Sequence, residues 1–163
     1  MTRFFSRTTL IVLFMLGVFL QGQTSTENVK SLDTDNEQRF VERMQEHLEA
    51  VSNKDLTTLK STLSPEGDMQ LILPNTEILY SVEKFMEYHQ AWFQDTTWTF
   101  ETKILSTEIG EKVGIAITEI MYREPERNGK PYFNHMVVSY ALKKIEGQWY
   151  IIKDHASSIE KAE

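Results

Sequence analysis

The sequence predicts an α+β domain in which helices pack on one face of a curved antiparallel sheet. Apolar residues recur at helical spacing in the first half of the chain and alternate with polar residues in the second half. Turn dipeptides and glycines separate the alternating segments, as they do in hairpins. Helices that precede a run of strands favour this layered arrangement over alternating βαβ units.

The helices are predicted from capping residues and apolar spacing. Residues 24–34 are mostly polar and aperiodic, and we expect them to form a flexible leader. A first helix is predicted from a capping box that opens at Thr34, with apolar residues at helical spacing as far as Val51. A second, short helix is expected to begin at Asp55, and a third is entered through Ser81 as its N-cap.

The strands are predicted from alternation bounded by turn residues. We expect them over residues 69–73, 77–80, 98–107, 113–123, 133–144 and 149–155. The dipeptide Asn128-Gly129 predicts a turn between two of the long strands. It lies in a polar connection, residues 124–131, whose charges we expect to form solvated surface.

The last hairpin places one carboxylate on an apolar face. A three-residue loop at residues 145–147 puts Tyr140, Tyr150 and Asp154 on one face, which is otherwise apolar and is expected to lie under the helices. A register error of one residue would exchange the roles of Asp154 and His155. The opposite face is mixed, so it is either wet or a subunit contact, and it carries His135, Val137, Trp149, Ile151 and His155.

Residues 1–23 are expected to form a secretory signal peptide. Arg3 and Arg7 precede an apolar run from Leu10 to Leu20, and polar residues follow it. A membrane-spanning helix needs about 20 apolar residues, so this run is too short. We therefore expect a secreted or periplasmic protein without membrane association after cleavage; an uncleaved N-terminal anchor is the alternative. With no cysteine, the chain is not expected to be a lipoprotein.

Composition excludes several classes of function. The chain has 163 residues, of which 40% are hydrophobic and 25% charged, as in a globular domain. A formal net charge of −7 argues against a nucleic-acid partner, because such binding needs clustered Lys and Arg. The absence of cysteine removes disulfides and thiolate catalysis. The four histidines lack metal-ligand spacing, and no nucleotide fingerprint is present, so we expect neither a metal nor a cofactor.

The chain resembles the nuclear transport factor 2-like superfamily and, within it, the SnoaL-like domains. The turn at residues 53–56, the following strand pair, the helix entered through Ser81 and the final strands carry the resemblance, which covers residues 35–160. The ending GQWYIIKDHAS, residues 147–157, is similar to the tail of many secreted SnoaL-like domains. The resemblance implies a cone-shaped sheet with three N-terminal helices on its concave face, a cavity, and a homodimer through the outer sheet face.

Ketosteroid isomerases of this superfamily use an Asp base together with a Tyr and a protonated Asp as hydrogen-bond donors. The resemblance places Leu73 at the position of the base, so this chemistry is not carried over. His47 occupies the position of the Tyr, and Tyr140 lies near that of the second Asp. The resemblance retains a cavity with two polar groups facing it.

Six residues are candidates for contacting a ligand: His47, Tyr88, Trp92, Tyr140, Asp154 and His155. His47 lies on an apolar helical stripe, either as a cavity-facing base or as a core histidine bonded to a backbone carbonyl. Tyr140 either donates a hydrogen bond into the cavity or packs in the core. Tyr88 and Trp92 either form an aromatic entrance to the cavity or pack in the core. Asp154 on an apolar face needs a partner, for which we expect His47; a solvated pair with His155 is the alternative.

Three functions follow from these candidates. The leading expectation is the binding of a small, largely apolar molecule in the cavity. The second is an enzyme of the isomerase, dehydratase or cyclase type that uses His47 with a tail carboxylate. The third is a dimeric interaction module without a ligand. The sequence alone leaves open whether the chain is an enzyme.

Overall fold

The computed structural model describes the backbone of residues 23–162 and the side chains of residues 34–162. Contacts divide the chain into a unit that ends at Asp35 and a unit that begins at Asn36, and the second unit contains the sheet. Residues 1–22 of the expected signal peptide lie outside the described residues.

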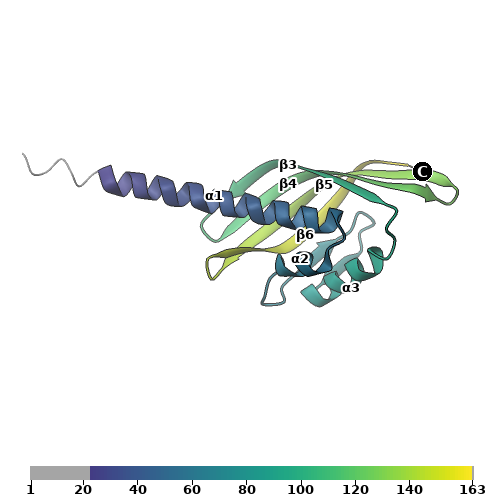
Figure 1. The fold of residues 1–163 in the computed structure, drawn as a ribbon, viewed down its shortest axis with the longest axis horizontal. Helices are drawn as coiled ribbons and strands as arrows, with labels where there is room; N and C mark the ends of the chain where they lie inside the picture. The colour runs from purple at the N-terminus through teal and green to yellow at the C-terminus, as the bar shows by residue number, and fades with distance from the viewer. Residues whose placement is uncertain (1–22, 163) are drawn as a thin grey trace, which may run out of the picture. The chain divides into compact units, whose positions relative to one another are not determined.

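The chain has the predicted α+β organisation (Figure 1). Helices α1 and α2 come first, the short strands β1 and β2 separate them from α3, and four long strands follow. The elements are α1 (Gln23–Ser52), α2 (Leu56–Ser61), β1 (Gln70–Ile72), β2 (Ile78–Tyr80), α3 (Val82–Trp92), β3 (Thr99–Ile109), β4 (Val113–Arg127), β5 (Lys130–Ile145) and β6 (Gln148–Lys161).

The strands form one mixed sheet in the order β2-β1-β6-β5-β4-β3. Strands β3 to β6 run antiparallel to one another, but β1 pairs with β6 in parallel, with Leu71 beside Asp154. The prediction of a wholly antiparallel sheet is therefore wrong at this edge. The long strand β6 would otherwise present an open edge, and the short strand β1 satisfies its backbone groups there.

Two predicted helix caps are confirmed. The Asp55 carboxylate accepts hydrogen bonds from the backbone N–H groups of Thr57 and Thr58, both at 3.0 Å, at the start of α2. The Ser81 hydroxyl accepts from the N–H of Lys84 at 3.3 Å at the start of α3. Each cap satisfies donors that have no partner within the first helical turn.

The first helix is longer than predicted. It begins at Gln23 and not at Thr34, so the expected leader, residues 24–34, is helical. No Gly or Pro interrupts the sequence from Gln23 to Ser52, and several of its polar residues are good helix formers. These properties explain why the helix already begins on the N-terminal side of the capping box.

Two tight turns determine where the long strands end. Asn128 and Gly129 connect β4 to β5 with φ values of 56° and 83°, and Glu146 and Gly147 connect β5 to β6 with φ values of 49° and 82°. Positive φ at both central positions is typical of a type I′ hairpin. The Asn-Gly turn is confirmed, but the strands run through residues 124–131, which were expected to be a connection. The second turn has two residues instead of the predicted three.

The shorter turn changes which side chains of β6 face the core. Trp149 and Ile151 are buried, although the predicted register placed them on the opposite face, and Tyr150 is only half-buried. The β5–β6 ladder then shifts where β6 carries one extra residue, a β-bulge. Beyond it Tyr140 pairs with Asp154, and Asp154 faces the core as predicted.

The residues of α1 that follow Asn36 pack closely on the sheet. Phe40 is fully buried, and its ring meets that of Trp149 edge-on with centroids 5.1 Å apart. A Cβ atom added at Gly114 on β4 would lie 2.5 Å from Cε2 of Phe40. Glycine is therefore required at this position because any side chain would collide with the buried ring.

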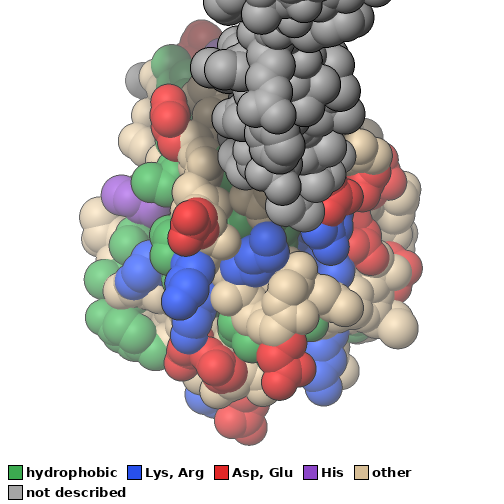
Figure 2. Space-filling view, turned by 90° about the vertical axis from the view of Figure 1, so that its left-hand side faces the viewer, with side chains coloured by type: hydrophobic (Ala, Val, Ile, Leu, Met, Phe, Trp, Pro, Cys, Tyr) green, Lys and Arg blue, Asp and Glu red, His purple; other side chains and the backbone are tan. Residues whose placement is uncertain are grey.

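Charged side chains of both signs are mixed over the surface. Lys143 Nζ lies 2.6 Å from Glu66 Oε2, and Arg123 Nη1 lies 2.7 Å from Glu101 Oε1. On the face drawn in Figure 2, Lys and Arg side chains are interspersed with Asp and Glu. Within the described part of the chain, no helix combines the length and apolar character needed to cross a membrane.

Candidate functional site

A cavity of about 490 Å³ lies against the inner face of the sheet. Its walls come from the end of α1, from α3, from β1 and the turn that follows it, and from strands β3 to β6. Most of the lining is aliphatic or aromatic and includes Leu71, Trp92, Phe100, Met136 and Val138. This size and lining are typical of sites that bind small molecules.

Asp154 is the buried carboxyl group of the cavity. It lies on β6 directly opposite Tyr140 on β5, and only 8% of the residue is exposed. Burial raises the pKa of its carboxyl group to about 7, because a charged carboxylate loses its hydration there. Among the described residues, none forms a hydrogen bond or an ion pair with this carboxyl group. It is therefore available to a ligand.

Two tyrosines line the cavity near Asp154. Burial, and then the charge of Asp154, raises the pKa of Tyr140 well above its usual value. Burial also raises the pKa of Tyr88, with smaller contributions from Glu77 and Asp154. Both phenols are therefore protonated at neutral pH and can donate a hydrogen bond to a bound molecule.

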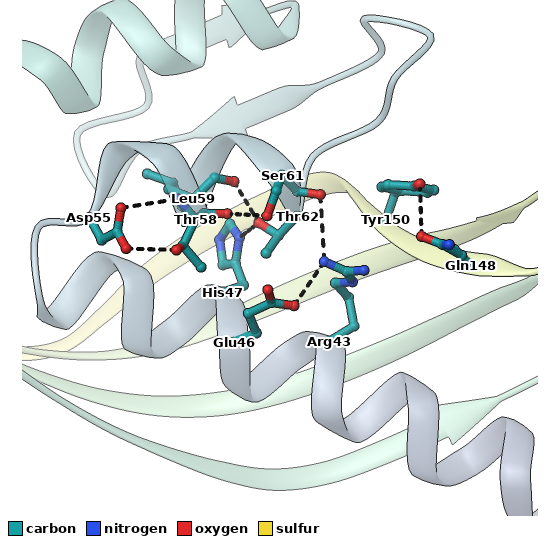
Figure 3. Close-up of polar contacts among 10 residues, drawn as sticks. All are labelled: Arg43, Glu46, His47, Asp55, Thr58, Leu59, Ser61, Thr62, Gln148 and Tyr150. Atoms are coloured by element: carbon teal, nitrogen blue, oxygen red, sulfur yellow. Dashed lines mark hydrogen bonds and ion pairs between the residues drawn. The ribbon is translucent and has the colours of Figure 1, made fainter.

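His47 lies behind the cavity wall and not on it. Its Nδ1 atom is 2.7 Å from the hydroxyl of Thr62 (Figure 3). The Thr62 hydroxyl donates its own proton to the carbonyl of Leu59 at 2.7 Å, so Nδ1 of His47 carries a proton and donates. Nε2 is then an unprotonated acceptor, buried without a partner among the described residues. Its ring packs edge-on against Tyr140, with centroids 5.5 Å apart.

The environment of His47 does not suit an acid–base pair with Asp154. Burial, and then the nearby His89 and Arg43, lowers the pKa of His47 to about 3. Its one hydrogen bond is to the Thr62 hydroxyl, so neither the expected pair with Asp154 nor the expected bond to a backbone carbonyl is formed in the structure.

The structure brings four of the six predicted site residues together. Tyr88, Trp92, Tyr140 and Asp154 all line the cavity. His155 is exposed on the opposite face of the sheet, because successive side chains of a strand point to opposite faces.

His89 on α3 lines the cavity and was not among the predicted site residues. It is 4% exposed, and its Nδ1–H donates to the carbonyl of Phe85 at 2.8 Å, which leaves Nε2 unprotonated. Burial lowers its pKa to about 4. The available signal was its position on the apolar face of the third predicted helix, where a core histidine and a cavity histidine have the same sequence pattern.

A second polar group lies where the cavity approaches the β4–β5 turn. Tyr122 donates a hydrogen bond to Oε1 of Glu124 at 2.6 Å, and Glu124 also accepts from Nε of Arg127 at 2.8 Å. The guanidinium of Arg127 lies 3.4 Å above the ring centre of Tyr132. Glu124 and Arg127 line the cavity, although their charge run predicted solvated surface. Only the strand pairing through this segment turns them towards the site.

Across the described part of the chain, no group of three His, Asp or Glu side chains is arranged to hold a metal ion. The side chains that line the cavity supply the carboxyl group of Asp154, several phenols, the imidazole of His89, and the polar group at the far end.

A family model described as a SnoaL-like domain matches residues 41–160. No curated protein sequence matches the chain. The match to the family model covers most of the chain and all cavity-lining residues except Lys161.

Solved structures with this fold have low sequence identity to the chain. A proposed dehydratase of the NTF2-like family from Streptomyces avermitilis is 11% identical with a TM-score of 0.66, covering 77% of this chain and 97% of its own. A ketosteroid isomerase-like protein from Erwinia carotovora atroseptica is 15% identical, with a TM-score of 0.62 and coverages of 72% and 92%. The association domain of CaMKII from C. elegans is 21% identical, with a TM-score of 0.57 and coverages of 76% and 96%. These similarities establish the fold alone.

Proposed function

The chain belongs to the SnoaL-like domain family, and on that premise we propose that it binds a small, largely apolar molecule in the cavity of its sheet. The observation that carries this proposal is the cavity of about 490 Å³ whose apolar wall holds the unpartnered carboxyl group of Asp154. Members of this fold often bind ligands or act as isomerases and dehydratases.

The apolar part of the ligand would lie against the aromatic wall. Trp92 lines the cavity and stacks on Trp98 with ring centroids 4.4 Å apart, so its position is held by the core. The ring of Phe100 packs edge-on against that of Trp92, with ring centroids 5.8 Å apart. Held rigidly in this way, the rings give a ligand a large contact area at little cost in side-chain entropy.

The polar part of the ligand would meet Asp154. A buried polar group without a partner costs free energy, and a ligand that hydrogen-bonds to it removes that cost. With a pKa of about 7, the carboxyl group is available both as an acceptor and as a donor at neutral pH. Tyr140 and Tyr88 supply further donors, so a hydroxyl or a carbonyl group fits this end of the cavity.

An enzyme of the isomerase or dehydratase type is the second candidate. It is favoured by the pKa of Asp154, because a general acid or base works best when its pKa lies near the working pH. The acid–base group would then be Asp154 with Tyr140 as a hydrogen-bond donor, and His47 would not take part. The proposed dehydratase and the ketosteroid isomerase-like protein of similar fold support this reaction class.

Secretion and dimerisation complete the proposal. The signal-peptide pattern of residues 1–23 supports export to the periplasm or the exterior. The outer face of β4 supports a homodimer, since Val113 and Ile115 there are 54% and 47% exposed. The similarity in fold to an association domain points in the same direction.

Native mass spectrometry of the protein purified from a periplasm tests the binding proposal. We expect a reproducible extra mass of a small molecule, and its loss in Val138→Phe, which fills the cavity from β5. Val137→Phe is the matched control, because Val137 is the neighbouring residue on the opposite face. A ligand-free wild type whose melting temperature no metabolite library shifts, or a bound mass that survives Val138→Phe unchanged, would refute the proposal.

A further inference from the structure

We propose that the end of the cavity beside the β4–β5 turn binds a carboxylate, so that the ligand is an amphipathic carboxylic acid. This inference rests on the proposed binding function and adds the chemical class of the ligand. It concerns a second polar end of the cavity, defined by Tyr122, Arg127, Asn134 and Lys161.

The second polar end is built on one row of paired residues. Asn134 on β5 lies opposite Tyr122 on β4 and opposite Lys161 on β6, and all three line the cavity. The row therefore crosses three neighbouring strands on their inner face. Such a position holds each side chain at a fixed place on a rigid sheet.

Asn134 is the buried polar side chain at this end without a partner. It is 8% exposed, its Oδ1 is fully buried, and no described residue hydrogen-bonds to its amide. A buried amide normally makes hydrogen bonds, and leaving it unpaired is costly. The Nδ2 atom is not enclosed as Oδ1 is and has no hydrogen-bond partner among the described residues, so the NH₂ group is available to donate to an anion.

The charged side chains at this end favour a ligand group with a single negative charge. Arg127 is engaged through Nε and Nη2 with Glu124, which leaves Nη1 free to donate. Lys161 is exposed and has no ion pair among the described residues. The charged side chains that line this end of the cavity, Arg127, Lys161 and Glu124, sum to one positive charge, which matches a carboxylate better than a doubly charged phosphate.

The other end of the cavity determines the orientation of the ligand. Asn134 and Tyr140 lie on the same face of β5, six residues apart, which is about 20 Å at the rise of a strand. Met136 and Val138 face the cavity between them and would contact an apolar chain. Asp154 lies beside Tyr140 and would repel a carboxylate, so the acid group belongs at the Asn134 end.

A series of ten-carbon probes that differ only in their head group tests the inference. We would titrate decanoate, 1-decanol and decyl phosphate into the purified protein at pH 7.5 and follow the tryptophan fluorescence, to which Trp92 in the cavity wall contributes. Decanoate should bind about tenfold more tightly than 1-decanol, because a hydrogen bond to a charged group is worth about one factor of ten. Added salt should reduce this difference in affinity between decanoate and 1-decanol, because it screens the charge of the carboxylate.

Two variants locate the carboxylate. Lys161→Gln should weaken decanoate about fivefold and leave 1-decanol unchanged, and Asn134→Leu should weaken decanoate about tenfold. The matched control is Lys153→Gln, because Lys153 is exposed on the other face of the same strand. Lys161 is itself exposed, so its replacement leaves the fold intact even if Asn134→Leu does not.

The outcomes separate this inference from the proposed function. Equal affinity for decanoate and 1-decanol, an unchanged ratio in Lys161→Gln, or tighter binding of decyl phosphate would overturn the carboxylate assignment and leave an apolar binding site. Failure of all three probes to bind would count against the binding function itself.

Discussion

Tyr140 and Asp154 face each other across strands β5 and β6, and within the described chain neither side chain has a hydrogen-bond partner. Both line the same apolar cavity. A pair of this kind lowers stability when the cavity is empty and becomes useful when a ligand supplies the missing bonds. The first two predictions concern the loss of stability that buried titratable groups of this region cause.

Asp154→Asn should stabilise the protein at alkaline pH. The pKa of Asp154 is about 7 in the folded state, compared with an ordinary value of 3.8, so the folded state binds the proton more tightly. This contribution to stability is full below pH 3.8 and is lost as the pH rises through 7, by about 4 kcal/mol in total. Urea unfolding should therefore show a gain for Asp154→Asn at pH 8 that shrinks towards pH 5. The exposed Asp68→Asn is the control, and an equal gain in both variants would contradict the prediction.

His47→Asn should make the protein less sensitive to acid. The pKa of His47 is lowered from 6.5 to about 3, so its contribution to stability is present above pH 6.5 and is lost as the pH falls towards 3. Between pH 6.5 and 5 this amounts to about 2 kcal/mol. Asn keeps a donor near the position of Nδ1 for Thr62 but does not titrate. Its free energy of unfolding should fall less over this range than that of the wild type, whereas the exposed His155→Asn should follow the wild type.

Gly114→Ala should destabilise the protein by about 1–3 kcal/mol, because the added methyl group collides with the buried ring of Phe40. Thermal unfolding of the single variant measures the loss. Combining it with Phe40→Leu, which removes the ring, should give a smaller total loss than the sum of the two single changes. Additive losses would mean that the two residues do not compete for the same space.

Tyr140→Phe should reduce ligand occupancy about fivefold to tenfold, because it removes a hydroxyl donor and keeps the ring. The fraction of protein that carries the ligand mass in native mass spectrometry gives this number. Tyr150→Phe, on the other face of the same hairpin, controls for the loss of a phenol elsewhere. Unchanged occupancy in Tyr140→Phe would place the polar contact elsewhere in the cavity.

Ile115→Lys should convert a dimer to a monomer in sedimentation experiments, because it places a charge in the proposed interface on the outer face of β4. Lys112→Ile, in the β3–β4 turn, has the opposite change of polarity and should leave the dimer intact. A wild type that is monomeric at high concentration would rule out the dimer altogether.

The class of fold and most elements were predictable because local signals were strong. The caps at Asp55 and Ser81 and the Asn128-Gly129 turn are confirmed, since each depends on backbone groups within a few residues. The parallel pairing of β1 with β6 was not predictable from such signals, because it joins strands far apart in the sequence.

The candidate site was predictable only in part. Tyr140 and Asp154 were found because a polar residue on an apolar face is visible in the alternation of a strand. The predicted turn was one residue too long, so Trp149 was assigned to the wrong face of the sheet. The β-bulge between Trp149 and Asp154 cancels this error, so Asp154 was assigned to the correct face. Glu124 and Arg127 were missed because a charged strand end and a charged loop have the same composition.

The parallel pair β1–β6 has a consequence for how the protein folds. Gln70 and Lys153 are neighbours in the sheet, joined by a side-chain hydrogen bond of 2.7 Å, yet they are 83 residues apart in the sequence. Closing so long a loop is slow, and contacts of this kind lower folding rates. During synthesis β1 has no partner on this side until residue 153 has left the ribosome, so the cavity acquires Leu71 and Asp154 together, in one late step. Amide protons of β1 and β6 should accordingly exchange with solvent as one cooperative unit.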